Sequence, residues 1–138
     1  MEQQKSISFI VTGCAYAVYN EMHYGLMESA YEAALTWELE QKGFHVERQV
    51  LLPLYYKGVK LEQTYRIDLL LERRIVIELK TTSQVLPEHR MQLMNYLRLT
   101  HLEYGMLINF GPEGVRVERY VFDETHNRVE LLTENVIR

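Results

Sequence analysis

Cysteine is almost absent from this chain of 138 residues, which contains a single one, Cys14. One cysteine excludes an intramolecular disulfide, a cysteine-rich zinc site and an iron–sulfur cluster. Long apolar runs are missing as well, since no window approaches the roughly eighteen apolar residues of a membrane helix. The first ten residues also lack the basic and apolar blocks of a secretory signal. These absences predict a protein of the reducing cytoplasm.

An excess of positive charge is missing too: 15 lysines and arginines face 19 aspartates and glutamates, for a net charge of -4. Most proteins that bind nucleic acid present a basic face, because cation–phosphate contacts and counterion release supply much of the affinity. The charge therefore argues mildly against a nucleic-acid partner. An enzyme is a partial exception, because its carboxylates collect a divalent metal that meets the phosphate. The length predicts one domain over residues 1–138, with little room for a second core.

The spacing of apolar residues predicts the order of secondary-structure elements. Two helices come first, one from Ser6 to about Met22 and one between Gly25 and Gly43. The elements expected after them are strands at 46–56, 59–71 and 75–79, a helix at 87–101, strands at 104–110 and 115–122, and an edge strand at 129–132. This α-α-β-β-β-α-β-β order predicts an α/β fold, a mixed β-sheet flanked by helices.

The short apolar segment from Ile75 to Leu79 carries an acid that ordinary core rules do not explain. Glu78 interrupts the run and Lys80 follows two residues later, so the alternation of a strand places both side chains on one face. Ten residues before Glu78, Asp68 interrupts another apolar strand. If the turn at residues 72–74 folds the two strands into a hairpin, Asp68 and Glu78 come to neighbouring rows of one sheet.

Two adjacent carboxylates repel each other, and each pKa rises if the pair is left alone. Mg²⁺ prefers oxygen ligands and is commonly held by one or two carboxylates together with waters and a substrate phosphate. A nearby ammonium such as Lys80 can orient or deprotonate the attacking water and stabilise the developing negative charge. Asp68, Glu78 and Lys80 therefore suit phosphodiester hydrolysis. The alternative is that both acids form structural salt bridges, with Arg66, Arg74 or Lys80 as partners.

Two helical features suggest further site residues. Glu28 lies on the margin of the buried stripe of its helix. There it either leans over the sheet as a third acidic ligand or serves the helix start, where the macrodipole favours negative charge. Gln92 and Tyr96 lie one helical turn apart on the helix after Glu78. They either pack at the boundary of the core or position the water, the lysine or a nucleic-acid backbone.

In their order along the chain, these residues resemble the GxxExxY family. Gly25, Glu28 and Tyr31 match the G-x-x-E-x-x-Y signature that gives the family its name. The matching segments that follow are 66–70 around Asp68, 76–80 with Glu78 and Lys80, 89–97 with Gln92 and Tyr96, and 105–110. The resemblance runs from about Ser6 to Tyr120, nearly the whole chain.

The GxxExxY family is similar to the PD-(D/E)xK nuclease superfamily, nearest to the branch that includes RecB-type nuclease domains. The resemblance implies a restriction-endonuclease-like core. It also implies metal ligation by Asp68, Glu78 and the backbone carbonyl of Leu79, with Glu28 as an outer acidic partner. Lys80 would be the catalytic lysine, and Gln92 and Tyr96 would form the accompanying Q-x-x-x-Y motif. The expected cofactor is Mg²⁺, with Mn²⁺ as the alternative, and the expected substrate is DNA, with RNA as the alternative.

Two non-enzymatic functions compete with a nuclease. One is a catalytically silent nucleic-acid-binding or protein-interaction module that keeps the nuclease fold. The other is a structural domain that works only within a homo-oligomer or a larger complex, which fits the small size. Retention of Asp68, Glu78 and Lys80 together favours the enzyme, because a module freed from catalysis has no need of a costly acidic cluster.

Overall fold

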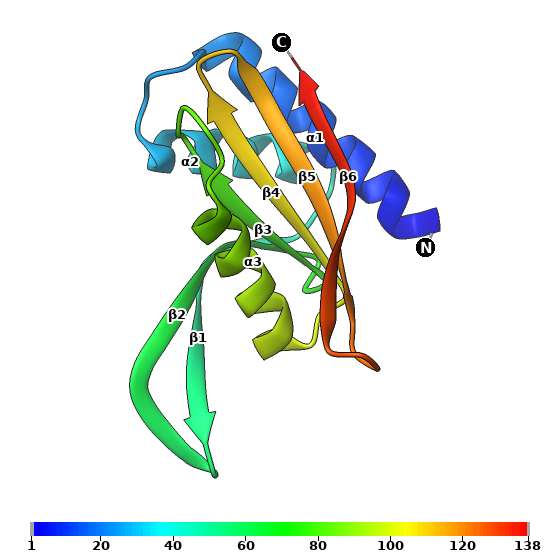
Figure 1. Cartoon of the computed structure of the whole chain (residues 1–138). Coiled ribbons are helices and arrows are strands. Elements are labelled where there is room, and N and C mark those ends of the chain that lie inside the picture. The colour runs from blue at the N-terminus through cyan, green and yellow to red at the C-terminus, as the bar shows by residue number, and fades with distance from the viewer. Residues whose placement is uncertain (1, 138) are drawn as a thin grey trace.

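A computed structural model describes residues 2–137, with side chains described from Ser6 to Glu134 and at Val136. The elements in chain order are α1 (Glu2–Met22), α2 (Glu28–Gln41), β1 (Val46–Tyr56), β2 (Val59–Leu71), β3 (Ile75–Lys80), α3 (Pro87–Thr100), β4 (Tyr104–Gly111), β5 (Gly114–Asp123) and β6 (Arg128–Ile137) (Figure 1). The predicted order is confirmed. The edge strand expected at 129–132 is longer than predicted, because β6 pairs with nearly the whole of β5.

The six strands form one sheet in the order β1-β2-β3-β4-β5-β6. All neighbouring strands are antiparallel except β3 and β4, which are parallel and therefore need the crossover that α3 provides. Helices α1 and α2 cover one face of the sheet and α3 covers the other (Figure 1). This is the expected α/β architecture, a mixed sheet flanked by helices. No helix within residues 2–137 is long and apolar enough to cross a membrane.

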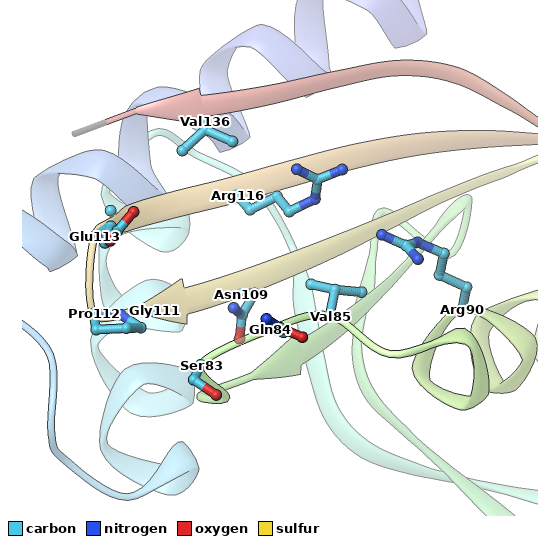
Figure 2. Close-up of a pocket in the computed structure, with 11 residues that line it drawn as sticks. Ser83, Gln84, Val85, Arg90, Asn109, Gly111, Pro112, Glu113, Arg116 and Val136 are labelled. Carbon is cyan, nitrogen blue, oxygen red and sulfur yellow. The ribbon is translucent and has the colours of Figure 1, made fainter.

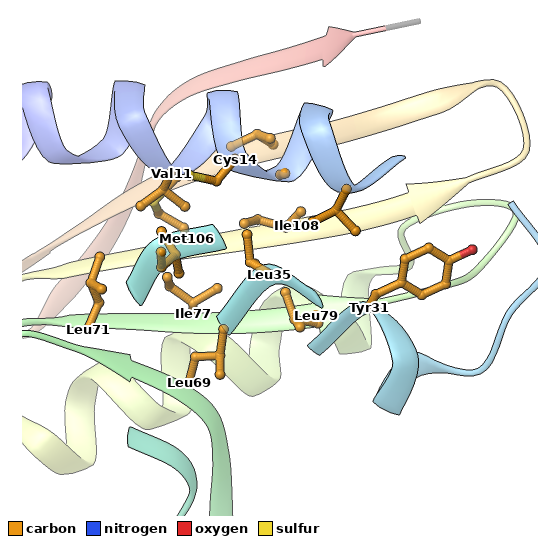
Figure 3. Close-up of a cluster of buried hydrophobic side chains, with 14 of the residues drawn as sticks. Val11, Cys14, Tyr31, Leu35, Leu69, Leu71, Ile77, Leu79, Met106 and Ile108 are labelled. Carbon is orange, nitrogen blue, oxygen red and sulfur yellow. The ribbon is translucent and has the colours of Figure 1, made fainter. Parts of the chain in front are cut away.

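The central strand β3 is buried on both faces of the sheet. Ile77 and Leu79 pack toward α1 and α2, while Val76 packs toward α3. Each face of the sheet thus has its own hydrophobic core. Figure 3 shows the core on the side of α1 and α2, where Cys14 lies among aliphatic side chains. Because water reaches neither face of β3, a charged side chain on this strand needs a compensating partner.

The turn between α1 and α2 is fixed by the first and last residues of the G-x-x-E-x-x-Y segment. Gly25 has a φ of 118°, a backbone conformation that residues other than glycine rarely adopt. The buried Tyr31 accepts a hydrogen bond from the Leu26 N–H (3.2 Å) and donates one to the His23 carbonyl. Its ring stacks on Phe110 at a centroid distance of 4.6 Å. Tyr31 thus fastens the turn to the sheet and determines where α2 begins.

Strands β1 and β2 extend beyond the rest of the sheet as a two-stranded hairpin (Figure 1). We call residues 51–66, from the Leu51–Arg66 pair to the turn, the β1–β2 arm. Its turn at Lys57 and Gly58 has φ values of 50° and 78°, as a two-residue type I′ turn requires. Near the base of the arm, Tyr65 packs edge-on against Tyr96 of α3.

Candidate active site

The candidate site lies where β2 separates from β3. The antiparallel ladder between these strands ends at the pair Leu69–Ile77, and Asp68 and Glu78 are the next residues on each strand. Their carboxylates take over the hydrogen bonds at this end. The Asp68 N–H donates to Oε1 of Glu78 (3.1 Å), and the Leu79 N–H donates to Oδ2 of Asp68 (2.9 Å). The structure therefore brings Asp68 and Glu78 together, as the hairpin register predicts.

The acids of this site resist ionisation, because burial and their mutual repulsion disfavour the charged forms. Burial, followed by the charge of Asp68, raises the pKa of Glu78 to about 9. Burial also raises the pKa of Asp68. At the first residue of α2, burial and then the charge of Asp68 raise the pKa of Glu28 to about 7. Lys80 acts in the opposite direction on all three carboxyl groups. One ammonium faces three acids, so the cluster is a favourable place for a further cation.

Lys80 ends β3 and is half-buried. Being two residues from Glu78, it shares that residue's face of the strand. In the parallel register Lys80 is level with Asn109 of β4. The Asn109 amide accepts a hydrogen bond from the Thr82 N–H and donates one to the Thr82 carbonyl, both at 2.9 Å. Asn109 therefore fastens the segment that follows Lys80, a role that reasoning from the sequence missed.

Helix α3 places Gln92 and Tyr96 over the acidic pair. The Gln92 side-chain amide donates to the Tyr96 hydroxyl at 3.1 Å, so the predicted one-turn pairing is present. Tyr96 is buried, and burial followed by the charge of Glu78 raises the pKa of its phenol. The phenol thus lies within the electrostatic reach of the carboxylate on β3. Leu79 has its side chain in the core, so only its main chain can serve this site.

Gln49 and Glu32 also belong to the site, and they were not predicted. Gln49 lies in the middle of β1 with a φ of 51°. Every other non-glycine residue with positive φ in the described chain lies in a turn or at a helix end. The register places Gln49 opposite Asp68, and its amide donates to Oδ1 of Asp68 (3.4 Å) and to Oε1 of Glu32. The buried Glu32 also accepts from Nε of Arg48 at 3.1 Å. Glu32 could have been found from its spacing, because it lies one turn after Glu28 on the same helix face.

The donor chemistry of this cluster fits a divalent metal, although no cage of ligands is preformed. Within residues 2–137, no three histidine, cysteine, aspartate or glutamate side chains converge closely enough to enclose an ion. Mg²⁺ does not require such a cage, because it keeps several waters and is held by one or two carboxylates and substrate phosphates. Asp68 and Glu78 supply the two carboxylates, and burial is the main reason that the pKa values of both are raised.

A separate pocket of about 650 Å³ lies beside this cluster, between the β3–α3 segment and the turn that joins β4 to β5 (Figure 2). Arg90 and Arg116 line it, but both guanidinium groups bind the fully buried Glu118, and Arg116 also binds Glu134. Two cations thus face two anions, so the pocket offers no uncompensated positive charge. None of Asp68, Glu78 and Lys80 lines it. We therefore place the candidate site at the end of the β2–β3 ladder and not in this pocket.

Comparisons with known proteins identify a superfamily and a similar fold. Residues 5–120 match a family model described as the PD-(D/E)XK nuclease superfamily. The crystal structure of SSO0001 is similar in fold, with a TM-score of 0.54 and 24% sequence identity. The similar region covers 71% of this chain and 52% of SSO0001, so the chain spans about half the length of that protein. None of the curated proteins shows significant sequence similarity to the chain.

Proposed function

The chain belongs to the PD-(D/E)XK nuclease superfamily, and we propose that it is a metal-dependent nuclease that hydrolyses phosphodiester bonds of DNA, with RNA as the alternative substrate. Membership of a nuclease superfamily implies a nucleic-acid substrate; the choice of DNA and the dependence on Mg²⁺ or Mn²⁺ are part of the proposal. We also propose that the chain is a GxxExxY protein of the RecB-like branch, because Gly25, Glu28 and Tyr31 match the G-x-x-E-x-x-Y signature in the turn before α2 and its first residues.

One observation supports the proposal most strongly. The buried carboxylate of Glu78 and the half-buried carboxylate of Asp68 occupy the end of an otherwise apolar ladder, and both have raised pKa values. A structural ion pair of the kind that the sequence left open would lower these pKa values. Among the described residues, neither arginine considered as a partner pairs with them: Arg66 is exposed on β2, and Arg74 lies in the turn between β2 and β3. A cluster that is costly when empty is expected where a cation binds during function.

In the proposed mechanism, Asp68, Glu78 and the Leu79 carbonyl would hold the metal, with Glu28 as an outer acidic partner. A divalent metal held there would supply Lewis-acid chemistry, polarising the phosphate and favouring ionisation of a water. The Lys80 ammonium orients the attacking water and stabilises negative charge that develops on the phosphate. Gln92 and Tyr96 position the water or the nucleic-acid backbone from above. Gln49 and Glu32 hold the Asp68 carboxylate in place from the opposite side, through the hydrogen bonds described above.

Cleavage assays with single-site variants test these roles. Purified protein is incubated with single- and double-stranded DNA and with RNA, in Mg²⁺ or Mn²⁺, beside Glu78→Gln and Lys80→Met. We expect each variant to lose on the order of 10²- to 10⁴-fold in cleavage rate, the usual contribution of a positioned acid–base group. Glu40→Gln and Lys42→Met are matched controls, because both residues are exposed at the end of α2. Equal cleavage by all five proteins would identify a contaminating nuclease and remove the assigned site.

Calorimetric titration with Mg²⁺ or Mn²⁺ separates metal binding from cleavage. Wild-type protein is expected to bind metal and to release protons on binding, because the carboxyl groups with raised pKa values must ionise. Glu78→Gln is expected to bind more weakly. An absence of binding by the wild type at millimolar metal would contradict the proposed metal dependence.

A further inference from the structure

The tip of the β1–β2 arm exposes aromatic rings that no other part of the described chain covers. Tyr55 and Tyr56 are 59% and 62% exposed, whereas Tyr31, Tyr96 and Tyr120 are almost fully buried. A tyrosine ring that stays in water forgoes the stabilisation that burial provides. Exposed aromatic groups on a projecting hairpin therefore point to contact with something outside the chain.

Lysines accompany both rings. Nζ of Lys57 lies 5.5 Å from the centre of the Tyr56 ring. Lys60 is the cross-strand partner of Tyr55, so the two side chains share one face of the hairpin. Each ring thus has an ammonium beside it. This arrangement suits a ligand that offers an apolar plane and an anion at short spacing.

The arm has a net positive charge, whereas the net charge of the whole chain is negative. It contains three cations, Lys57, Lys60 and Arg66, and one acid, Glu62, for a net charge of +2. The whole chain has a net charge of -4, so residues outside the arm carry -6. The overall negative charge counts against a nucleic-acid partner, but this one projecting element carries a net positive charge. A negatively charged ligand would be attracted to the arm and repelled by most of the remaining surface.

We propose that the β1–β2 arm binds a single-stranded segment of nucleic acid, with Tyr55 and Tyr56 stacking on bases and Lys57 and Lys60 contacting the phosphates beside them. Aromatic stacking together with phosphate contacts is the usual way in which proteins hold single strands without reading their sequence. The proposal rests on the proposed nuclease function for the identity of the ligand, and it adds a binding surface remote from the cleavage site.

The length of the arm determines which substrates can use it. Lys60 lies eight residues before Asp68 on β2, which corresponds to about 26 Å at about 3.3 Å per residue. Stacked nucleotides advance about 3.4 Å each, so about eight of them span the distance from the carboxylates to the tip. A phosphodiester without bases at this distance gains nothing from the arm.

Binding to a fluorescently labelled 20-nucleotide single strand, measured by anisotropy in EDTA, tests the arm without any cleavage. Wild-type protein is compared with a Tyr55→Ala/Tyr56→Ala variant, and we expect binding to weaken by on the order of tenfold or more. A Tyr55→Phe/Tyr56→Phe variant keeps the rings and is expected to bind like the wild type. Lys57→Ala and Lys60→Ala are each expected to reduce the slope of log affinity against log salt by about 0.7. Tyr16→Ala, which removes an exposed tyrosine from α1, is the matched control and is expected to have no effect.

Cleavage of bis(p-nitrophenyl) phosphate separates the arm from the chemistry, because this diester has no bases to stack. Equal turnover by wild type and arm variants, with slower cleavage of the 20-nucleotide strand by the variants, supports the arm. Loss of strand binding by arm variants supports it even if no form of the protein cleaves anything, an outcome that would refute only the nuclease. Equal strand binding by the wild type and the double alanine variant overturns the proposal. So does an absence of strand binding by the wild type, or a sedimentation change that shows the arm joining copies of the chain instead.

Discussion

Substitution of Glu118 by glutamine offers a quantitative test of the charge network that fastens α3 to the sheet. The Glu118 carboxylate is fully buried and accepts four hydrogen bonds. Arg90 of α3 donates two, at 2.9 and 2.8 Å, and Arg116 and Tyr120 of β5 donate one each, both at 2.6 Å. Glu118→Gln keeps the shape of the side chain but leaves two guanidinium groups without their shared anion.

The expected loss of folding free energy can be calculated from the pKa of Glu118. Burial alone would raise it, but the hydrogen bonds from Arg90, Tyr120 and Arg116 outweigh burial and lower it from 4.5 to about 2. A depressed pKa means that the ionised form stabilises the folded state above the unfolded-state pKa. At about 1.4 kcal/mol per pKa unit, this is worth about 3 kcal/mol at neutral pH. The same figure is typical for the loss of one partner from a buried ion pair.

Urea unfolding followed by circular dichroism measures this contribution. At pH 7 we expect the free energy of unfolding of Glu118→Gln to be about 3 kcal/mol below that of the wild type. As the pH falls from about 4.5 toward 2, the wild type loses its advantage and the gap between the two proteins closes. Glu124→Gln is the control, because Glu124 is exposed and its ion pair is with the exposed His101, and its effect is expected within about 0.5 kcal/mol. A gap below about 1 kcal/mol at pH 7, or one that persists unchanged at pH 3, would refute the reasoning.

Three further predictions concern the candidate site. Gln49 has a φ of 51°, which glycine adopts without strain, so Gln49→Gly should leave the thermal midpoint of unfolding unchanged or raise it. The rate of cleavage should fall by tenfold or more, because the side chain that contacts Asp68 is lost. Full activity in this variant would show that Gln49 does not position Asp68. Asn109→Ala removes the hydrogen bonds to Thr82 and should cost about 1–3 kcal/mol, with faster hydrogen exchange at the Thr82 amide, and unchanged exchange would contradict it. Mg²⁺ should raise the thermal midpoint of the wild type but not that of Glu78→Gln, and equal shifts would mean that the metal binds elsewhere.

The fold and the centre of the site follow from local patterns in the sequence. Period-3.6 and period-2 runs mark the elements, and the apolar run of β3 makes Glu78 conspicuous because a strand buried on both faces has no ordinary place for an acid. The β2–β3 turn is short, so its register can be counted from the sequence, and this count brings Asp68 beside Glu78. Glu28 could be placed only through its motif, because its neighbours on the sheet come from distant parts of the chain.

Other features depend on contacts that no local pattern encodes. The positive φ of Gln49 occurs inside a strand, where no glycine and no turn signal in the sequence predicts it. The network around Glu118 joins α3 to β5 and requires the relative position of a helix and a strand. Lysines and tyrosines at 55–60 suggest a solvated hairpin turn in the sequence, and only the sheet shows that this turn projects beyond β3.

The site and the arm have one structural cause. Strand β2 pairs with β3 over Leu69–Leu71 and then leaves it, although its pairing with β1 continues to the turn at Lys57 and Gly58. This departure frees the Leu79 N–H to bind Asp68, and it also sends the remainder of β2 away from the sheet, paired with β1. A sheet that stayed paired through residue 68 would place main-chain carbonyls where the carboxylates now lie, and it would hold the arm flat against β3. The proposed cleavage requires the carboxylates at the end of the ladder, and the proposed strand binding requires the projecting arm. A substitution that extended the β2–β3 ladder by one pair should therefore impair both cleavage and strand binding.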